Sequence, residues 1–150
     1  MMSGNSNDWP LSLRYANVKS GPRYMTDDQV KDPVPSVSMD VIEELRELAD
    51  EDTPEFLKEL LHSFLADAER HLESMQIGLD EGDLPKVMHA SHTLKSSSAN
   101  LGALGLSAFC KTIEIGSRDG IREGLAEAIT GGQAEFEKVR QEMTALPDYN

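Results

Sequence analysis

The chain has 150 residues, of which 39% are hydrophobic and only 5% aromatic, and its formal net charge is −13 at pH 7. This length suits one domain whose core is filled by aliphatic side chains. The negative charge argues against nucleic acid or an anionic membrane surface as a partner, because both attract Lys and Arg. The single Cys110 excludes an intramolecular disulfide. With no run near the ~18 apolar residues of a membrane span and no secretory signal, the chain is predicted to be cytoplasmic.

Residues 1–37 differ in composition from the rest of the chain. They contain four prolines and no sustained hydrophobic period, and their four basic and four acidic residues cancel. All of the net charge therefore belongs to residues 38–150. We predict an irregular N-terminal extension over 1–37 and one folded domain over 38–150.

The first predicted helices follow this boundary. Ser38 is placed to cap a short helix whose apolar residues are Val41, Ile42, Leu45 and Leu48. A polar break follows, and Thr53-Pro54-Glu55 then combines a capping hydroxyl, a first-turn proline and an acid at the positive end of a helix dipole. Apolar residues at three-and-four spacing extend this second helix to about residue 80.

Three more helices complete the predicted bundle. Gly82 is suited to end the second helix and Asp83 to cap the next, which covers about 84–100. A fourth helix is predicted over about 104–115, stopped by Gly116. The last, over about 119–145, is expected to kink or break at Gly131-Gly132. Short loops make neighbours antiparallel, so the predicted fold is all-α: an antiparallel up-and-down four-helix bundle with a short additional N-terminal helix.

The helix over 84–101 carries the candidate site. At about 100° per residue, Val87, Ser91, Leu94, Ser98 and Leu101 share one face, which we assign to the core. His92 lies about 120° from the centre of that face and is predicted to be exposed. Five residues lie near His92 around the helix: Pro85, His89, Ser96, Ala99 and Ala103. Apart from His89 their side chains are compact, so a partner molecule can approach His92 closely. Lys95 lies one turn on and is placed to balance negative charge.

The run from His92 to Gly102, HTLKSSSANLG, resembles the signature of the histidine-containing phosphotransfer (HPt) domain of bacterial phosphorelay signalling. It matches His-x-Leu-Lys, a following small residue, and a glycine ten residues after the histidine, with Leu94 and Gly102 as structural positions. The resemblance covers about 38–146. One departure is Ser96, at a position where the family commonly has glycine.

The resemblance implies a phosphorelay intermediate. His92 would accept a phosphoryl group from a receiver-domain aspartate through Nε2 and pass it to another receiver, with Lys95 giving electrostatic support. His89, Ser96, Ala99 and Ala103 would line the docking surface. The implied partners are response-regulator receiver domains and a hybrid histidine kinase. No cofactor of its own is expected, and Mg²⁺ would come from the receiver. No ATP-binding motif is present, so ATP-dependent kinase activity is not expected.

Two alternatives stay open from the residues alone. The first is a metal-binding helical bundle, because His89 and His92 are three residues apart and Glu59-x-x-His62 resembles half of a di-iron site. Only one such Glu-x-x-His pair is present, so no metal ligands are assigned. The second is a module that binds receiver domains without phosphoryl transfer. Transfer from a phosphorylated receiver distinguishes it from a relay.

Overall fold

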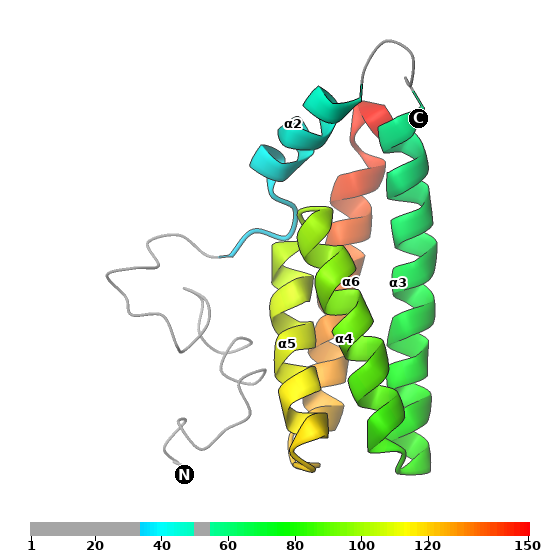
Figure 1. The fold of residues 1–150 in the computed structure, drawn as a ribbon, viewed down its shortest axis with the longest axis vertical. Coiled ribbons are helices and arrows are strands. Elements are labelled where there is room, and N and C mark those ends of the chain that lie inside the picture. Colours follow the sequence, from blue (N-terminus) through cyan, green and yellow to red (C-terminus); the bar gives the residue numbers. More distant parts are fainter. Residues whose placement is uncertain (1–33, 50–54) are drawn as a thin grey trace, which may run out of the picture.

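The computed structural model describes residues 34–49 and 55–150, and the long elements within these ranges are all helices (Figure 1). In chain order they are α2 (Met39–Leu48), α3 (Phe56–Glu81), α4 (Leu84–Asn100), α5 (Leu104–Arg118) and α6 (Leu125–Thr144), followed by the short 3₁₀ helix η2 (Pro147–Tyr149). None of the helices in these two ranges has the length and apolarity needed to cross a membrane.

Helices α3 to α6 form the predicted four-helix bundle. Each packs against the next in the chain, and α6 closes the ring against α3. Figure 1 shows them alternating in direction, with α2 set across the end of the bundle where α3 begins and α6 ends. The core is aliphatic, and its fully buried large side chains come from every helix: Ile42, Leu61, Met75, Val87, Leu94, Leu106, Ile113, Ile129, Val139 and Met143.

Helix α2 is held at both ends. The Ser38 hydroxyl caps it as predicted, accepting a hydrogen bond from the Val41 backbone N–H at 3.4 Å. Near its other end, the Arg46 guanidinium donates hydrogen bonds to both carboxylate oxygens of Asp148, with Nη2 2.6 Å from Oδ1. Because Asp148 lies in η2, this ion pair fastens the C-terminal segment to the additional helix.

The turn between α3 and α4 is the one predicted. Gly82 adopts a left-handed conformation with φ of 72°, and the Asp83 side chain accepts a hydrogen bond from the Lys86 N–H at 3.1 Å. The predicted cap and proline of α3, Thr53 and Pro54, lie outside the described residues. Within them α3 begins at Phe56, with no side-chain cap from Glu55.

The predictions are wrong for the stop of α5 at Gly116, the start of α6 near residue 119 and its break at Gly131-Gly132, and right for the end of α6 near residue 145. Helix α5 continues past Gly116 to Arg118, and α6 begins at Leu125 and runs unbroken through Gly131 and Gly132. These glycines are sites of close helix packing. A Cβ at Gly131 would lie 2.5 Å from Cε1 of Phe109 on α5, and one at Gly116 would lie 3.2 Å from Cδ2 of Leu125 on α6.

The packed part of the chain includes residues before position 38. Val37 is buried, and the Pro35 carbonyl accepts a hydrogen bond from the Gly105 N–H at 3.1 Å. The Ser38 N–H donates to the Gly102 carbonyl at 2.8 Å. This segment therefore crosses the junction between α4 and α5 and anchors the end of the helix that carries His92.

Gly102 is required at that junction for two reasons, and its replacement should be costly. Its φ is +84°, and an added Cβ would lie 3.0 Å from Cβ of Val41 and 3.1 Å from the Ser38 carbonyl. Gly120 shares the positive φ, at +75°, but has open space around it. Gly120→Ala should destabilise the protein by about 1 kcal/mol through backbone strain alone, and Gly102→Ala by about 2 kcal/mol more through overpacking. Urea unfolding of both variants measures the difference, and equal losses would show that the contact with α2 is unimportant.

Candidate functional site

Helix α4 buries the face predicted from its sequence. Val87, Ser91, Leu94 and Ser98 are each 0% exposed. The buried Ser91 hydroxyl is satisfied within the helix, donating to the Val87 carbonyl at 2.9 Å. Leu94 thus lies in the core beside the site, while the side chain of His92 is 60% exposed. The imidazole therefore projects from a helix whose opposite face is fixed by packing.

The side chain that positions His92 comes from the neighbouring helix. Glu114 on α5 places its Oε2 2.8 Å from Nδ1 of His92 and its Oε1 2.7 Å from the Lys95 ammonium. The Lys95 contact is an ion pair, without the direction of a good hydrogen bond. One carboxylate therefore bridges the two residues that the sequence singled out.

This bridge determines the tautomer of His92. An ionised carboxylate can only accept hydrogen bonds, so the proton of the neutral ring lies on Nδ1. The lone pair of Nε2 is then free on the exposed side of the ring. Neutral imidazole with an available lone pair is a good nucleophile near neutral pH.

Glu114 stays ionised despite its position. Its side chain is only 12% exposed, and this burial raises the pKa. The contacts from Lys95 and then from His92 lower it by more, so the pKa of Glu114 is below its ordinary value. At neutral pH the carboxylate is available to both partners.

Helix α5 is packed against α4 in the turns that precede Glu114. The Ser107 hydroxyl donates to the Lys95 carbonyl at 2.9 Å, which joins the two helices beside the site. Cys110, one turn before Glu114, is fully buried, and burial raises the pKa of its thiol. The cysteine is therefore a core residue behind the site and not a reactive group within it.

Three of the four predicted docking residues are on the surface near His92, and one is not. His89, Ser96 and Ala99 are exposed on α4. Ala103 is 0% exposed and is the N-cap residue of α5, so its placement on the docking surface is wrong. The prediction extended the helical angle past Asn100, where α4 ends and the chain turns at Gly102.

The histidines and the glutamate named for the metal-binding alternative do not come together as a metal site in the described residues. In residues 34–49 and 55–150 no three His, Cys, Asp or Glu side chains are grouped to hold a metal ion. His62 has a different partner: its Nε2 lies 2.8 Å from the Tyr149 carbonyl, and its ring meets the Tyr149 ring edge-on. His62 thus helps to seat η2 on α3.

The fold and this site define a class: a four-helix bundle that presents an exposed histidine, held by a carboxylate, on one of its helices. The model of the Hpt domain family matches residues 59–148. The chain belongs to that family.

Individual relatives agree with this assignment. Multistep phosphorelay regulator 1 of Schizosaccharomyces pombe is 33% identical over 93 residues, which cover 59% of this chain and 32% of that protein. Histidine-containing phosphotransfer protein 5 of Arabidopsis thaliana is 29% identical over 106 residues, covering 69% and 68%. The crystal structure of histidine-containing phosphotransfer protein B from Pseudomonas aeruginosa PAO1 superposes with a TM-score of 0.67 at 30% identity, covering 73% of this chain and 92% of that one. The chain therefore matches only about a third of the yeast regulator.

Proposed function

We propose that the protein is a phosphorelay intermediate in which His92 accepts a phosphoryl group from the aspartate of a receiver domain and passes it to a second receiver. The observation that carries the proposal is the exposed imidazole whose Nδ1 is held by Glu114, which leaves Nε2 as the nucleophile. Membership of the Hpt domain family and the names of the relatives support it.

The transfer needs no base on this protein. The Nε2 lone pair forms the new N–P bond while the acyl O–P bond breaks and its electron pair stays on the receiver's aspartate. The Nδ1 proton remains in place, so the phosphorylated ring carries a positive charge, which the Glu114 carboxylate balances at 2.8 Å. In the second transfer the aspartate of another receiver forms a new O–P bond while the N–P bond breaks and its electron pair returns to Nε2 of His92.

Lys95 supplies positive charge for the phosphoryl group itself. Its ammonium is paired with Glu114, and its side chain is 33% exposed, so it can also approach a phosphoryl group on the neighbouring ring. Mg²⁺ held by the receiver would neutralise charge on the transferring group. Glu114 already contacts the Lys95 ammonium and the His92 ring, so we assign no metal ligand at the His92 site.

The docking surface is proposed to centre on His92, with His89, Ser96 and Ala99 around it. A hybrid histidine kinase and its receiver are the proposed upstream partners, in the cytoplasm. The division into an extension over 1–37 and a domain over 38–150 stays a prediction, modified only by the packing of residues 35–37 against the bundle.

Transfer from a receiver tests the proposal directly. Receiver domains encoded in the source genome, labelled with radioactive acetyl phosphate, are mixed one by one with the full chain. At least one should lose label to this protein, as an acid-labile and alkali-stable phosphoprotein. A receiver that binds tightly but never transfers label would instead support the interaction-only alternative.

A further inference from the structure

The basic and acidic residues of this protein are unevenly distributed along the chain. Residues 86–118 hold four basic residues and one acid, Glu114, whereas the rest of the chain holds 26 of the 27 acids and 10 of the 14 bases. This stretch comprises nearly all of α4 and α5, the two helices that build the His92 site. A chain of net charge −13 thus has a formal charge of +3 (four bases minus one acid) over the stretch that contains its candidate nucleophile.

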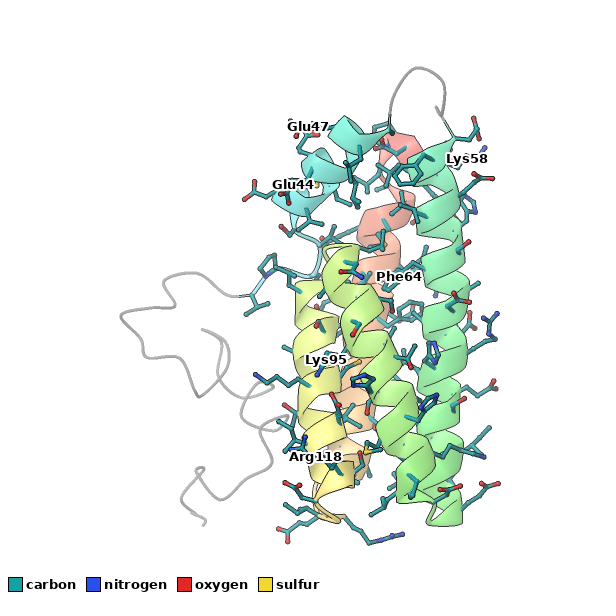
Figure 2. The ribbon with its side chains drawn as sticks, viewed as in Figure 1. Glu44, Glu47, Lys58, Phe64, Lys95 and Arg118 are labelled. Atoms are coloured by element: carbon teal, nitrogen blue, oxygen red, sulfur yellow. The ribbon has the colours of Figure 1, made fainter. Side chains whose placement is uncertain are left out.

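The geometry brings two of these bases to the Glu114 face of α5. Lys111 precedes Glu114 by three residues and Arg118 follows it by four, so all three share one side of the helix. Glu114 faces His92, at 2.8 Å, and its charge is balanced by the Lys95 ammonium at 2.7 Å. Figure 2 shows Lys95 and Arg118 on the side where α4 and α5 lie. The Arg118 side chain is 57% exposed, and its contact with exposed Asp119 is of the weak surface kind.

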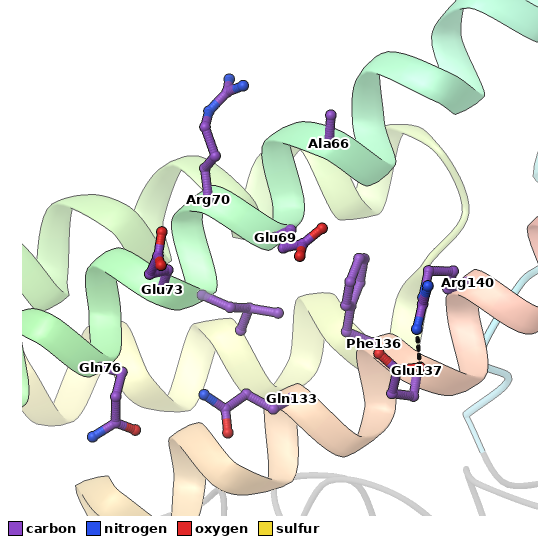
Figure 3. Close-up of a pocket in the computed structure, with 10 residues that line it drawn as sticks. Ala66, Glu69, Arg70, Glu73, Gln76, Gln133, Phe136, Glu137 and Arg140 are labelled. Atoms are coloured by element: carbon purple, nitrogen blue, oxygen red, sulfur yellow. Dashed lines mark hydrogen bonds and ion pairs between the residues drawn. The ribbon is translucent and has the colours of Figure 1, made fainter.

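The opposite side of the bundle, between α3 and α6, is acidic. An open groove of about 690 Å³ lies there, with Glu69, Glu73 and Glu137 along it (Figure 3). Its two bases, Arg70 and Arg140, are each paired with an acid one turn away, Asp67 and Glu137. The groove lining thus has three acids against two bases, so this side offers an acidic partner no excess of positive charge.

Resting on the proposed function, we propose that the α4–α5 side, marked by Lys95, Lys111 and Arg118, steers receiver domains whose face around the phosphoaspartate is acidic. A site that combines a phosphoacceptor carboxylate with bound Mg²⁺ needs clustered carboxylates, so such a face has complementary charge. Steering acts on the encounter: it raises the association rate and orients the partner with His92 toward its phosphoryl group.

The experiment compares two double charge reversals. Lys111→Glu with Arg118→Glu alters the steering side, and Arg70→Glu with Arg140→Glu makes the same charge change on the groove side. The probe is the phosphorylated receiver from the source genome that transfers fastest to the wild type. The first pair should lower the second-order transfer rate constant about 10-fold at low ionic strength, and the second pair should change it less than about 2-fold. Near 1 M salt, where the screening length is about 3 Å, the variants should converge.

Equal effects of the two pairs, or a loss that persists at high salt, would overturn the proposal. Lys111→Gln with Arg118→Gln removes the two positive charges without adding carboxylates to the last turns of α5. This pair should lower the transfer rate constant by less than the charge reversals do, and the loss should likewise disappear at high salt. Circular dichroism checks that each variant is folded. If the wild type accepts no phosphoryl group from any receiver, the proposed function fails. Calorimetry with the receiver that binds the wild type most tightly, repeated on both charge-reversal pairs, then still decides on which side that receiver docks.

Discussion

Replacing His92 with glutamine should abolish phosphoryl acceptance. The amide of glutamine keeps polarity and approximate size but has no nucleophilic lone pair on nitrogen, so the N–P bond cannot form. We expect label transferred from a phosphorylated receiver to fall on the order of 10³-fold or more, to background. The substituted side chain is exposed on α4, so the unfolding midpoint should move little.

His89→Gln is the matched control for this loss. His89 is exposed one turn earlier on the same helix, but no hydrogen bond is shown to fix its ring. Its replacement should leave the extent of labelling unchanged and alter the rate only through docking. Labelling that survives in His92→Gln but disappears in His89→Gln would move the site to the other histidine.

Removing Glu114 should have the next largest effect. In Glu114→Ala the His92 ring loses its only described anchor, both tautomers become populated, and Lys95 loses its partner. Misorientation of a nucleophile has large kinetic consequences, so we expect the saturating transfer rate to fall about 10- to 100-fold. Rapid-quench single-turnover measurements at saturating receiver give this rate without the contribution of docking.

Glu114→Gln separates orientation from charge. The glutamine carbonyl can still accept the Nδ1 proton of His92, but it cannot neutralise Lys95 or the charged phosphorylated ring. Its rate should lie between the wild type and Glu114→Ala. If glutamine and alanine were equally slow, charge balance and not orientation would be the role of Glu114. If alanine were as fast as the wild type, Glu114 would have no role in positioning.

Much of the fold could be predicted because local signals agreed along the chain. The apolar spacing of α3, the turn at Gly82-Asp83 and the angular position of His92 all depend on residues close in sequence. The errors arose where distant packing determines the outcome. From the sequence alone, Gly131 is interpreted as a helix breaker. In the structure, the Phe109 ring of α5 occupies the space that a side chain at position 131 would fill.

The same limit explains what was missed at the site. Glu114 lies 22 residues after His92, and its role depends on how α4 packs against α5, which no periodicity in one helix reveals. A signal was present, because Glu114 is the lone acid in residues 86–118 and follows the apolar run of α5. Ala103 failed for the opposite reason: a helical angle was extended beyond the residue where the helix ends.

The most direct test of the His92 assignment is the NMR spectrum of the phosphorylated protein with ¹⁵N-labelled histidines. Long-range ¹H–¹⁵N correlations identify which ring nitrogen carries phosphorus and which carries the proton. We predict one phosphorylated ring, His92, with phosphorus on Nε2 and the proton on Nδ1 against Glu114. Phosphorus on Nδ1 of His92, or on any other histidine, would contradict the arrangement of His92 and Glu114 proposed for the transfer.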